Sequence, residues 1–425
     1  MTDLFDDLAY RGLIHQETDP EGLRRHAAEG PRCVYAGFDP TATSLTIGNL
    51  VPLLLLRRFQ DAGHRPVVVV GGGTGLIGDP SGKEAERKLR TPAEVEAHVT
   101  AQRPIYERVL SFTGPTAAEL VNNADWLTKL SFVEALRDIG KHFSVNMMIQ
   151  KDSVRRRLEE REQGISYTEF SYMLLQAYDF LHLFDAKNVT IQIAGSDQWG
   201  NLVAGVELTR KVRQAELFGL TAPLVTKADG SKFGKTEAGA IWLSASHTSA
   251  YAFYQFWLAT VDQDIERYLK IFTLFPREKI DELLAEHARD PGARVAHRAL
   301  AAHVTELLHG APAREQAEAA ARALFSGDVA GLDAATIEEV FASAPSTDHA
   351  LESLSGDGVP FADLLVQAGV AKSKREAREL LVTGGVSVNG ERVAVDGALR
   401  AERLLHGRVA LIRRGKKTWH VARFR

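Results

Sequence analysis

The sequence predicts an α/β fold, with helices packed on a parallel sheet, followed by an α-helical segment and a small α+β module. Residues 34–38 and 67–70 are short apolar runs that each lead into a polar or glycine-rich turn, which is typical of strands in a parallel sheet. Residues 249–324 have helical spacing throughout. Residues 359–425 combine two short helical patterns with a hairpin signal at Asn389-Gly390, so strands and helices are both expected there.

The two predicted strands and the turns that follow them form a candidate nucleotide site. After the first strand, the turn at residues 39–43 leads to a leucine-rich helix with Pro52 in its first turn, where proline is tolerated. Backbone N–H groups at a helix N-terminus lack intrahelical partners, and the helix dipole favours an anion there. After the second strand, the glycines of residues 71–83 allow the backbone to approach a ligand closely. This pattern predicts phosphate binding.

A dinucleotide-binding motif is present in this region, but its context is wrong for a dehydrogenase. Residues 73–78 read G-x-G-x-x-G, which in dehydrogenases opens a helix and precedes a strand ending in an acidic residue. Here residues 79–82 (Asp-Pro-Ser-Gly) interrupt any helix, and residues 83–90 are charged rather than strand-like. The sequence also lacks the P-loop pattern G-x-x-x-x-G-K-[ST]. A dehydrogenase and a P-loop ATPase are therefore both disfavoured.

Composition indicates an ordinary globular protein of two or three domains. The 425 residues are 45% hydrophobic and 25% charged, which is enough to bury a substantial core. The single cysteine, Cys33, excludes an intramolecular disulfide and fits a reducing compartment. The acidic N-terminus has no signal-peptide pattern, and the longest apolar run, residues 50–56, is too short to span a membrane. We therefore expect a cytoplasmic protein without a membrane partner.

The charge of the chain is unevenly distributed. Residues 359–425 contain 14 lysines and arginines and six acidic residues, which gives this segment a charge of +8 although the whole chain carries −4. The remainder of the chain is therefore acidic. A basic module on an acidic body suggests a polyanionic partner, although a solvated basic surface would have the same composition.

A polar face is predicted on an otherwise apolar helix at residues 168–184. The helix is apolar around most of its circumference, so it should be buried. Tyr172, Gln176 and Asp179 nevertheless share one face, because they are spaced by four and three residues. Buried polar groups need partners, which a polar ligand could supply. The alternative is a hydrogen-bond network within the protein.

Two further segments suggest nucleotide contacts. Residues 189–193 are a buried-type strand, and Asp197 and Gln198 follow it at the edge where open parallel sheets bind ligands, in a position to hold ribose hydroxyls. Lys232 and Lys235 lie three residues apart in a glycine-containing loop, which suggests a mobile clamp for phosphate. A loop that is simply solvated is the alternative for the lysines.

The remaining segments have plainer patterns. We expect a helical arm at residues 1–33, helices at 92–112, 132–143, 361–367 and 373–381, a linker at 343–358 and a hairpin at 386–393. The sequence has no internal repeat, no Cys/His cluster with zinc spacing and no G-x-S-x-G serine motif. We therefore expect no protein-bound metal.

Five stretches, in this order, resemble those of class I aminoacyl-tRNA synthetases, and specifically of bacterial-type tyrosyl-tRNA synthetases. They are residues 35–41 (Y-A-G-F-D-P-T), 78–83 (G-D-P-S-G-K), 172–179, 195–201 (G-S-D-Q-W-G-N) and 232–236 (K-F-G-K-T). Residues 359–393 are similar to the S4 RNA-binding domain. Each stretch alone is a weak signal, but together they extend the resemblance over essentially the whole chain.

The resemblance implies a particular domain order. A Rossmann-like α/β catalytic domain would occupy residues 1–225, and a connector with the Lys-Phe-Gly-Lys-Thr loop would occupy residues 226–248. An α-helical domain on the anticodon side would follow at residues 249–342. A linker at residues 343–358 would lead to an S4-like RNA-binding domain at residues 359–425.

The resemblance also implies a tyrosine–tRNA ligase, which activates L-tyrosine with ATP to tyrosyl-adenylate and transfers tyrosine to the 3′ end of tRNA(Tyr). Tyr35 and Asp179 would bind the phenol of the substrate. The other implied tyrosine-binding residues are Tyr172, Gln176 and Asp79, which would hold the ammonium group, with Asn123 and Gln198. The implied ATP-binding residues are Gly37, Asp39, Thr41, Gly48, Gly195, Asp197 and Lys235. The implied catalytic residues, which would stabilise the pentacoordinate phosphate and the departing pyrophosphate, are Thr41, Thr46, Asn49, Lys83, Arg87, Lys232 and Lys235.

Further partners follow from the same resemblance. Mg²⁺ would arrive with ATP rather than in a cage of protein ligands. The family forms homodimers in which tRNA crosses both subunits. The implied tRNA-binding residues are Lys151, Arg210, Lys211, Lys372, Arg375, Arg413, Arg414, Lys416 and Lys417.

One position departs from the family pattern. Where the family has His-Ile-Gly-His, residues 46–49 read Thr-Ile-Gly-Asn. Asn49 can supply an amide N–H in place of an imidazole N–H, whereas Thr46 offers one hydroxyl, which we expect to donate to a phosphate oxygen. An RNA-binding paralogue with weak or no aminoacylation is the alternative, although the lysine loop and the tyrosine-pocket residues argue against it. A tryptophan-specific relative is disfavoured because Tyr35 and Asp179 are a phenol-binding pair.

Overall fold

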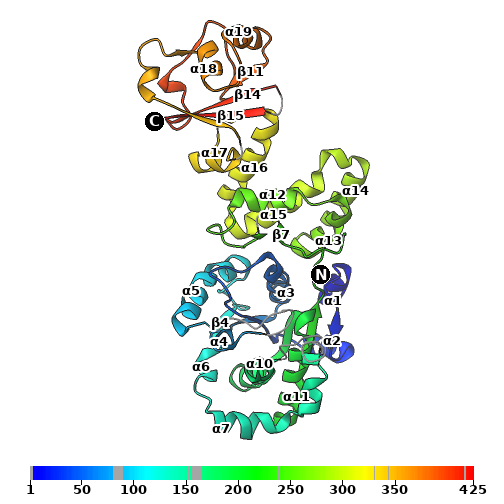
Figure 1. The fold of residues 1–425 in the computed structure, drawn as a ribbon. Coiled ribbons are helices and arrows are strands. Elements are labelled where there is room, and N and C mark those ends of the chain that lie inside the picture. Colours follow the sequence, from blue (N-terminus) through cyan, green and yellow to red (C-terminus); the bar gives the residue numbers. More distant parts are fainter. Residues whose placement is uncertain are drawn as a thin grey trace. The chain divides into compact units, whose positions relative to one another are not determined.

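In the computed structural model, the described residues are 3–79, 90–151, 154–155, 165–236, 239–329, 331–342, 344–415 and 418–425. Their contacts divide the chain into two compact units. The first comprises Met1–Thr248 and Ala259–Leu308, and the second comprises Ser249–Leu258 and His309–Arg425. Figure 1 shows the elements of both units, coloured along the chain. No helix within the described ranges combines the length and the apolar composition needed to cross a bilayer.

A six-stranded sheet forms the centre of the first unit, with the strand order β1-β6-β5-β2-β3-β4. The strands are β1 (Gln16–Glu17), β2 (Cys33–Phe38), β3 (Arg65–Val70), β4 (Glu119–Asn122), β5 (Val189–Gly195) and β6 (Phe218–Ala222). Neighbouring strands are parallel except β1, which runs antiparallel to β6 at the edge. β3 and β5 are buried almost throughout, as expected for strands covered on both faces. The predicted parallel α/β architecture is confirmed.

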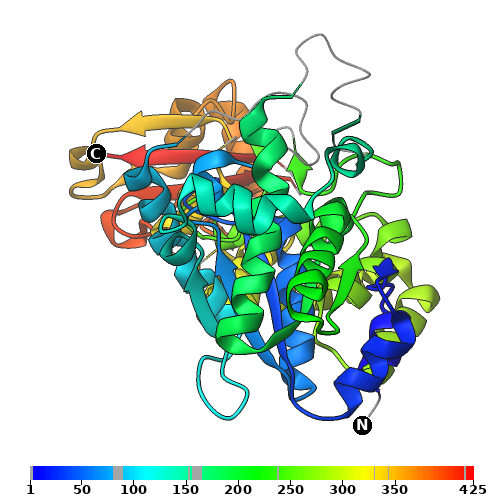
Figure 2. The same cartoon turned by 90° about the horizontal axis from the view of Figure 1, so that it is seen from below.

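Helices cover both faces of this sheet (Figures 1 and 2). α3 (Leu50–Asp61) and α5 (Pro92–Val109) lie on one side, and α10 (Tyr167–Lys187) and α11 (Trp199–Arg213) lie on the other. α10 packs through Phe180 against Tyr35 of β2, with ring centroids 5.1 Å apart. The predicted buried helix at residues 168–184 is therefore confirmed, and it is slightly longer than expected.

Two predicted helical segments differ from the structure. In the N-terminal arm, β1 lies between α1 (Leu4–Tyr10) and α2 (Pro20–Ala28) and extends the sheet, although two residues are too few to show a strand period. The helix expected at residues 132–143 is broken into short turns. These are α7 (Phe132–Glu134), a π-helical turn (Ala135–Ile139) and a 3-10 turn (Gly140–His142).

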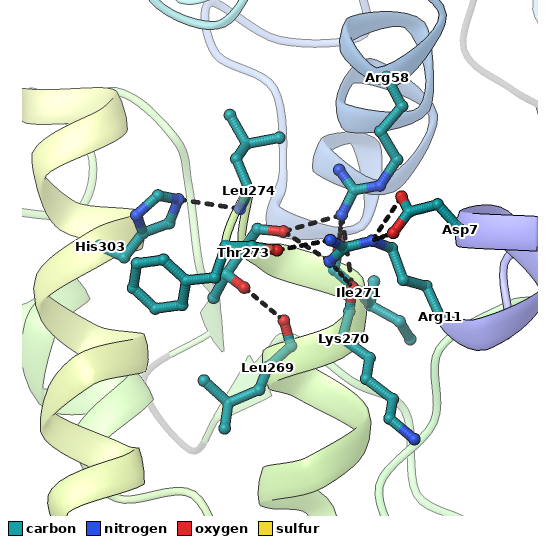
Figure 3. Close-up of polar contacts among 10 residues, drawn as sticks. Asp7, Arg11, Arg58, Leu269, Lys270, Ile271, Thr273, Leu274 and His303 are labelled. Atoms are coloured by element: carbon teal, nitrogen blue, oxygen red, sulfur yellow. Dashed lines mark hydrogen bonds and ion pairs between the residues drawn. The ribbon is translucent and has the colours of Figure 1, made fainter. Parts of the chain in front are cut away.

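Three helices, α13 (Asp262–Phe272), α14 (Arg277–Arg289) and α15 (Val295–His309), complete the first unit. The C-terminal end of α13 is capped by two buried arginines (Figure 3). Arg11 Nη1 donates to the carbonyls of Lys270 and Thr273 at 2.9 and 3.1 Å. Arg58 Nη2 donates to the carbonyls of Ile271 and Thr273 at 3.2 and 2.8 Å. The positive charges thus satisfy carbonyls that a helix end leaves unpaired and favour the negative end of its dipole.

We expect Arg11→Ala to lower the free energy of unfolding of the first unit by about 2–4 kcal/mol, because each buried group left without its partner costs about 1–3 kcal/mol. The substitution removes the Arg11 donor from the Phe275 carbonyl and leaves Asp7, which pairs with Arg11 at 2.8 Å, without its cation. The carbonyls of Lys270 and Thr273 lose one of their two donors and keep Arg58. Urea unfolding followed by circular dichroism measures the change. The exposed residue Arg25 offers a matched control, and equal losses in Arg11→Ala and Arg25→Ala would contradict the capping role.

The second unit joins helices to a five-stranded sheet of order β12-β11-β14-β15-β9. The strands are β9 (Ser346–His349), β11 (Val386–Val388), β12 (Glu391–Arg392), β14 (Val409–Arg414) and β15 (Thr418–Phe424), and a separate pair is formed by β10 (Val359–Pro360) and β13 (Ala398–Leu399). The helices are α12 (Ala250–Leu258), α16 (Ala311–Ser326), α17 (Ala334–Val340), α18 (Phe361–Gln367) and α19 (Lys374–Val382). The predicted helices at residues 361–367 and 373–381 are thus confirmed, the second within one residue.

The hairpin is also confirmed. Asn389 and Gly390 both have positive φ values, 53° and 86°, which is the backbone that a type I′ turn between β11 and β12 requires. The segment expected as a linker, residues 343–358, instead contributes β9, which pairs in parallel with β15. The segment expected as one helical domain is divided between the units, because α12, α16 and α17 belong to the second and α13–α15 to the first.

Candidate active site

Polar side chains gather at the carboxyl edge of the central sheet, beside α10. Asp39 follows β2, Thr74 follows β3, Asn123 follows β4, and Gln198 follows β5. Because β2 to β5 are parallel, these four positions meet at one edge, where open α/β sheets bind ligands. Asp179 faces this edge from α10, because Asn123 bonds to it.

Asp179 is buried and held by two donors. Trp126 Nε1 donates to Asp179 Oδ1 at 2.7 Å, and Asn123 Nδ2 donates to Asp179 Oδ2 at 2.9 Å. Burial raises the pKa of Asp179 to about 7, and the two hydrogen bonds oppose that rise.

The hydroxyl of Tyr35 is buried close to this carboxylate. Among the described residues none gives it a hydrogen bond, and the residue is 1% exposed. Burial, and after it the charge of Asp179, raises the pKa of Tyr35, so the two side chains interact electrostatically. Buried hydroxyls normally have a partner. The Tyr35 hydroxyl and Asp179 therefore suit a ligand that brings a hydroxyl of its own.

A second carboxylate, Asp39, is held by Tyr172 and Thr74. The Tyr172 hydroxyl donates to Asp39 Oδ2 at 2.9 Å, and Thr74 Oγ1 donates to Asp39 Oδ1 at 2.7 Å. A Cβ atom at Gly71 would collide with the Asp39 carboxylate, so glycine is required where the turn passes it. Asp39, expected from the sequence to contact ATP, is thus bonded to Tyr172, a residue expected to bind tyrosine.

The turns after β3 and β5 are joined by Gln198. Its Nε2 atom donates to Asp79 Oδ2 at 2.6 Å and to Asp197 Oδ2 at 3.1 Å, while Asn201 Nδ2 donates to its Oε1 atom at 3.0 Å. Asp79 is 7% exposed, whereas Asp197 reaches solvent. The structure thus brings residues assigned to tyrosine and to ATP side by side. Gln176, on the same helix as Asp179, is half-buried.

Residues assigned to the nucleotide line a more open edge. Gly37, Thr41 and Gly48 are exposed. Apart from its chain neighbours, no described residue has an atom within 4 Å of where a Cβ of Gly37 would lie, so the described part of the chain leaves the end of β2 open. At Gly195 a Cβ atom would meet Asp197 Oδ1 at 2.7 Å, so the backbone and this carboxylate lie close together.

Thr46 and Asn49 bond to each other at the entrance of α3. The backbone N–H and the hydroxyl of Thr46 both donate to Asn49 Oδ1, at 3.1 and 2.9 Å. In the structure the Thr46 hydroxyl proton is directed at Asn49, whereas the sequence-based expectation directs it at a phosphate oxygen of the substrate. Because the amide oxygen of Asn49 accepts both bonds, its Nδ2–H group remains directed away from Thr46.

The loop with the two lysines packs against the same helix entrance. The Ile241 N–H donates to the Gly234 carbonyl at 2.9 Å, and the Ile47 N–H donates to the Ile241 carbonyl at 3.0 Å. Gly234 has a φ of 76°, and a Cβ atom there would collide with Ile47. Lys232 and Lys235, on either side of this contact in the sequence, are exposed to solvent.

Of the residues expected to bind tRNA, some are exposed to solvent and others are bonded to neighbouring protein groups. Arg210, Lys211, Lys372 and Arg375 are exposed. Lys151 is half-buried, and its ammonium donates to the carbonyl of Gly200. Arg414 donates to the Val370 carbonyl and pairs with Glu376, and Arg413 lies over the ring of Trp419 at 5.2 Å. The residues assigned from sequence that lie outside the described ranges are Lys83, Arg87, Lys416 and Lys417.

Sequence reasoning missed two residues of the site, Thr74 and Trp126. Trp126 binds Asp179, and Thr74 joins Asp39 to Asn123, whose Nδ2 donates to Thr74 Oγ1 at 3.0 Å. The position of Trp126, three residues after Asn123 in a polar loop, was the only sequence signal for either.

Comparisons with known proteins agree with this geometry. Residues 27–326 match the family model of tRNA synthetases class I (W and Y), and residues 336–422 match the tyrosine–tRNA ligase SYY-like C-terminal domain. The chain is 52% identical over 425 residues to a tyrosine–tRNA ligase of Geobacillus kaustophilus, covering 99% of this chain and 100% of the relative. It is 49% identical over 424 residues to tyrosine–tRNA ligase 1 of Bacillus anthracis, with 99% and 100% covered.

Solved structures show the same fold. A C-terminally truncated mitochondrial tyrosyl-tRNA synthetase of Aspergillus nidulans superimposes with a TM-score of 0.70 at 31% identity, over 76% of this chain and 95% of that one. The tyrosyl-tRNA synthetase of Archaeoglobus fulgidus, at 17% identity and a TM-score of 0.54 over 73% of this chain and 99% of that one, agrees in fold alone.

Proposed function

The chain belongs to the class I tRNA synthetases for tryptophan and tyrosine, and from this premise we propose how its residues perform the tyrosine–tRNA ligase reaction. The full-length identity to tyrosine–tRNA ligases supports this activity over an inactive RNA-binding paralogue. The observation that carries the substrate assignment is the buried hydroxyl of Tyr35 beside Asp179, which has no hydrogen-bond partner among the described residues.

The phenol of tyrosine binds between Tyr35 and Asp179. Trp126 and Asn123 each use one oxygen of Asp179 and fix its orientation, and each carboxylate oxygen keeps further lone pairs for a ligand. The phenol O–H donates to Asp179, and its oxygen accepts from Tyr35. Both buried groups then have partners, which favours a substrate with a hydroxyl over one without it.

The ammonium of tyrosine binds among Tyr172, Gln176 and Asp79. Burial is the largest cause of the raised pKa of Tyr172, and the negative charges of Asp39 and Asp79 raise it further. Tyr172 therefore lies near two carboxylates. Two carboxylates beside a buried surface attract a cation. Asp39 acts here by orienting Tyr172, rather than by contacting ATP as the sequence suggested.

ATP binds along the open edge next to this pocket. Gly37, Gly48 and Gly195 let the nucleotide approach the backbone, and Asp197 accepts hydrogen bonds from the ribose hydroxyls. Gln198 donates both to Asp197 and to Asp79, so it links the ATP site to the tyrosine pocket. The residues that stabilise the phosphates are Thr41, Asn49, Lys83, Arg87, Lys232 and Lys235. Mg²⁺, bound to the phosphates of ATP, supplies further positive charge there.

Positioning and charge stabilisation then carry the reaction. A carboxylate oxygen of tyrosine attacks the α-phosphorus of ATP, the new P–O bond gives tyrosyl-adenylate, and pyrophosphate leaves with the electrons of the broken bond. Cations and N–H groups aimed at the developing charge lower the barrier, and no covalent enzyme intermediate is needed. A hydroxyl at the 3′ end of tRNA next attacks the tyrosyl carbonyl and releases AMP. ATP–pyrophosphate exchange, measured with each amino acid in turn, tests the assignment.

Transfer RNA binds the basic surface of the second unit, where Lys372 and Arg375 are exposed. We expect the double variant Lys372→Glu/Arg375→Glu to weaken tRNA(Tyr) binding about 10–100-fold. The slope of log K against log[salt] should fall in magnitude by about two, because each lost phosphate contact lowers it by about one. Filter binding at several salt concentrations measures both, and pyrophosphate exchange without tRNA should not change. Arg108→Glu, an exposed residue of α5, is the control; equal effects in the two proteins would refute the assignment.

We also propose that two copies of the chain form a homodimer in the cytoplasm. Large apolar side chains are exposed within one stretch of the first unit, namely Phe132 (67%), Val133 (69%), Leu136 (44%), Val145 (57%), Ile149 (40%) and Tyr167 (63%). Large exposed apolar patches are typical of protein interfaces. A second copy that covers this stretch would remove these side chains from water.

A further inference from the structure

Three side chains with metal-binding chemistry meet in the first unit, on helices that carry no residue of the candidate active site. Asp262 is the first residue of α13, His287 lies in the last turn of α14, and His297 lies in the first turn of α15. A 3-10 turn (Pro291–Ala293) and Arg294, which has a left-handed backbone with a φ of 51°, reverse the chain between the two histidines. Their ring centroids are therefore only 5.0 Å apart.

The two distances from the Asp262 carboxylate to the histidines have the spacing expected within one coordination sphere. Asp262 Oδ1 lies 3.5 Å from His287 Nε2 and 3.3 Å from His297 Nε2. One ligand atom from each residue lies within 4.8 Å of the others. Two ligands bound about 2.0–2.1 Å from a tetrahedral zinc lie roughly 3.3 Å apart. N–H···O hydrogen bonds are shorter, at about 2.7–3.2 Å. The geometry thus suits a shared ion better than direct hydrogen bonds.

The rings are buried, whereas the carboxylate reaches solvent. His297 is 0% exposed and His287 8%, but the side chain of Asp262 is 58% exposed. Both ring nitrogens of His297 are buried, and neither makes a geometrically well-formed hydrogen bond to a described residue. The Thr260 carbonyl lies close enough to act on the ring as a backbone acceptor, but it also accepts from Arg294 at 3.1 Å. Buried polar atoms normally have a partner. An ion at Nε2 would supply one, and the exposed carboxylate leaves a path by which it can enter.

Two charged side chains beside the cluster act on a bound cation in opposite directions. Arg294, which donates to the Thr260 carbonyl at 3.1 Å, disfavours a cation, and Asp262 offsets that charge.

We propose that Asp262, His287 and His297 bind a divalent transition-metal ion. Two imidazoles and one carboxylate match zinc, with a fourth position left for water. The ion joins the ends of α13, α14 and α15 and so stabilises this helical part of the first unit. This site differs from the expectation of no protein-bound metal, because its ligands form no zinc-spaced motif along the chain. It does not depend on the proposed function.

The test uses the full chain, first stripped of metal with a chelator and then titrated with Co²⁺ and Zn²⁺. We expect one ion per chain, a visible absorption band of tetrahedral Co²⁺ that Zn²⁺ abolishes, and a higher unfolding temperature with Zn²⁺. Asp262→Asn and His287→Gln should each weaken metal binding at least about tenfold. Residues that only hydrogen-bond to a metal ligand already lower metal affinity by about 10–100-fold when they are changed, and a direct ligand should matter at least as much. Asp262 is exposed, so its variant should fold whether or not metal is bound.

A half-buried histidine outside the cluster provides the matched control. His142→Gln changes a histidine in the 3-10 turn of residues 140–142, outside the cluster, and should bind Co²⁺ as the parent does. The proposal is overturned if the parent binds no stoichiometric metal. It is equally overturned if Asp262→Asn and His287→Gln bind metal as tightly as His142→Gln, because the ion would then lie elsewhere.

Discussion

Phenylalanine should support pyrophosphate exchange about 10⁴–10⁵-fold less efficiently than tyrosine, a preference already known for this enzyme family. The structural reason is the pair formed by Tyr35 and Asp179. With phenylalanine in the pocket, the buried Tyr35 hydroxyl and the Asp179 carboxylate would both remain without their ligand partner. Values of kcat/KM for exchange with the two amino acids measure the preference. Comparable values would refute the pocket.

Tyr35→Phe separates the hydroxyl from the rest of the pocket. It should lower kcat/KM for exchange with tyrosine about 2–15-fold, as expected for one net hydrogen bond of about 0.5–1.5 kcal/mol. The value of kcat/KM with phenylalanine should hardly change. Tyr178→Phe is the matched control, because Tyr178 lies on the same helix as Asp179 but its ring faces His182. If Tyr35→Phe lowered kcat/KM equally for tyrosine and phenylalanine, the Tyr35 hydroxyl would not contact the phenol of the substrate.

Asn49→Ala should slow adenylate formation about 10²–10³-fold, roughly 2.7–4 kcal/mol, which is typical for loss of one preorganised donor in the transition state. In the structure the amide oxygen of Asn49 accepts from Thr46, so its Nδ2–H group is the donor left for a phosphate. Tyrosine affinity should change little, because Asn49 is not in the tyrosine pocket. Presteady-state adenylate formation and equilibrium tyrosine binding, measured separately, decide this.

Thr46→Val tests the other member of the Thr46–Asn49 pair. The change removes the O–H···Oδ1 bond but keeps the backbone bond to Asn49, so we expect a loss of about 2–15-fold, the size of one net hydrogen bond. Thr46→Ser should restore the rate. A loss in Thr46→Val as large as that in Asn49→Ala would mean that Thr46 contacts phosphate itself, as the sequence alone suggested.

Features that depend on near neighbours in the chain were predictable from the amino-acid sequence. The Asn389-Gly390 turn was predictable because only a few residues adopt positive φ at both positions. α10 was predictable from its apolar composition, and its polar face showed that Tyr172 and Asp179 would lie together. The edge of the sheet that carries Gln198 followed from the rule that parallel strands present their carboxyl ends at one side.

Partnerships between residues far apart in the chain became visible only in the folded protein. Thr74 and Trp126 join the site through bonds to residues far along the chain, and no local pattern encodes such pairs. β9 lies in a segment with the composition of a linker, because its strand is formed by pairing with β15 and not by its own periodicity. Asp262 and the two histidines near it show no motif for the same reason: three helix ends bring them together, and helix packing is not written in the spacing of any one segment.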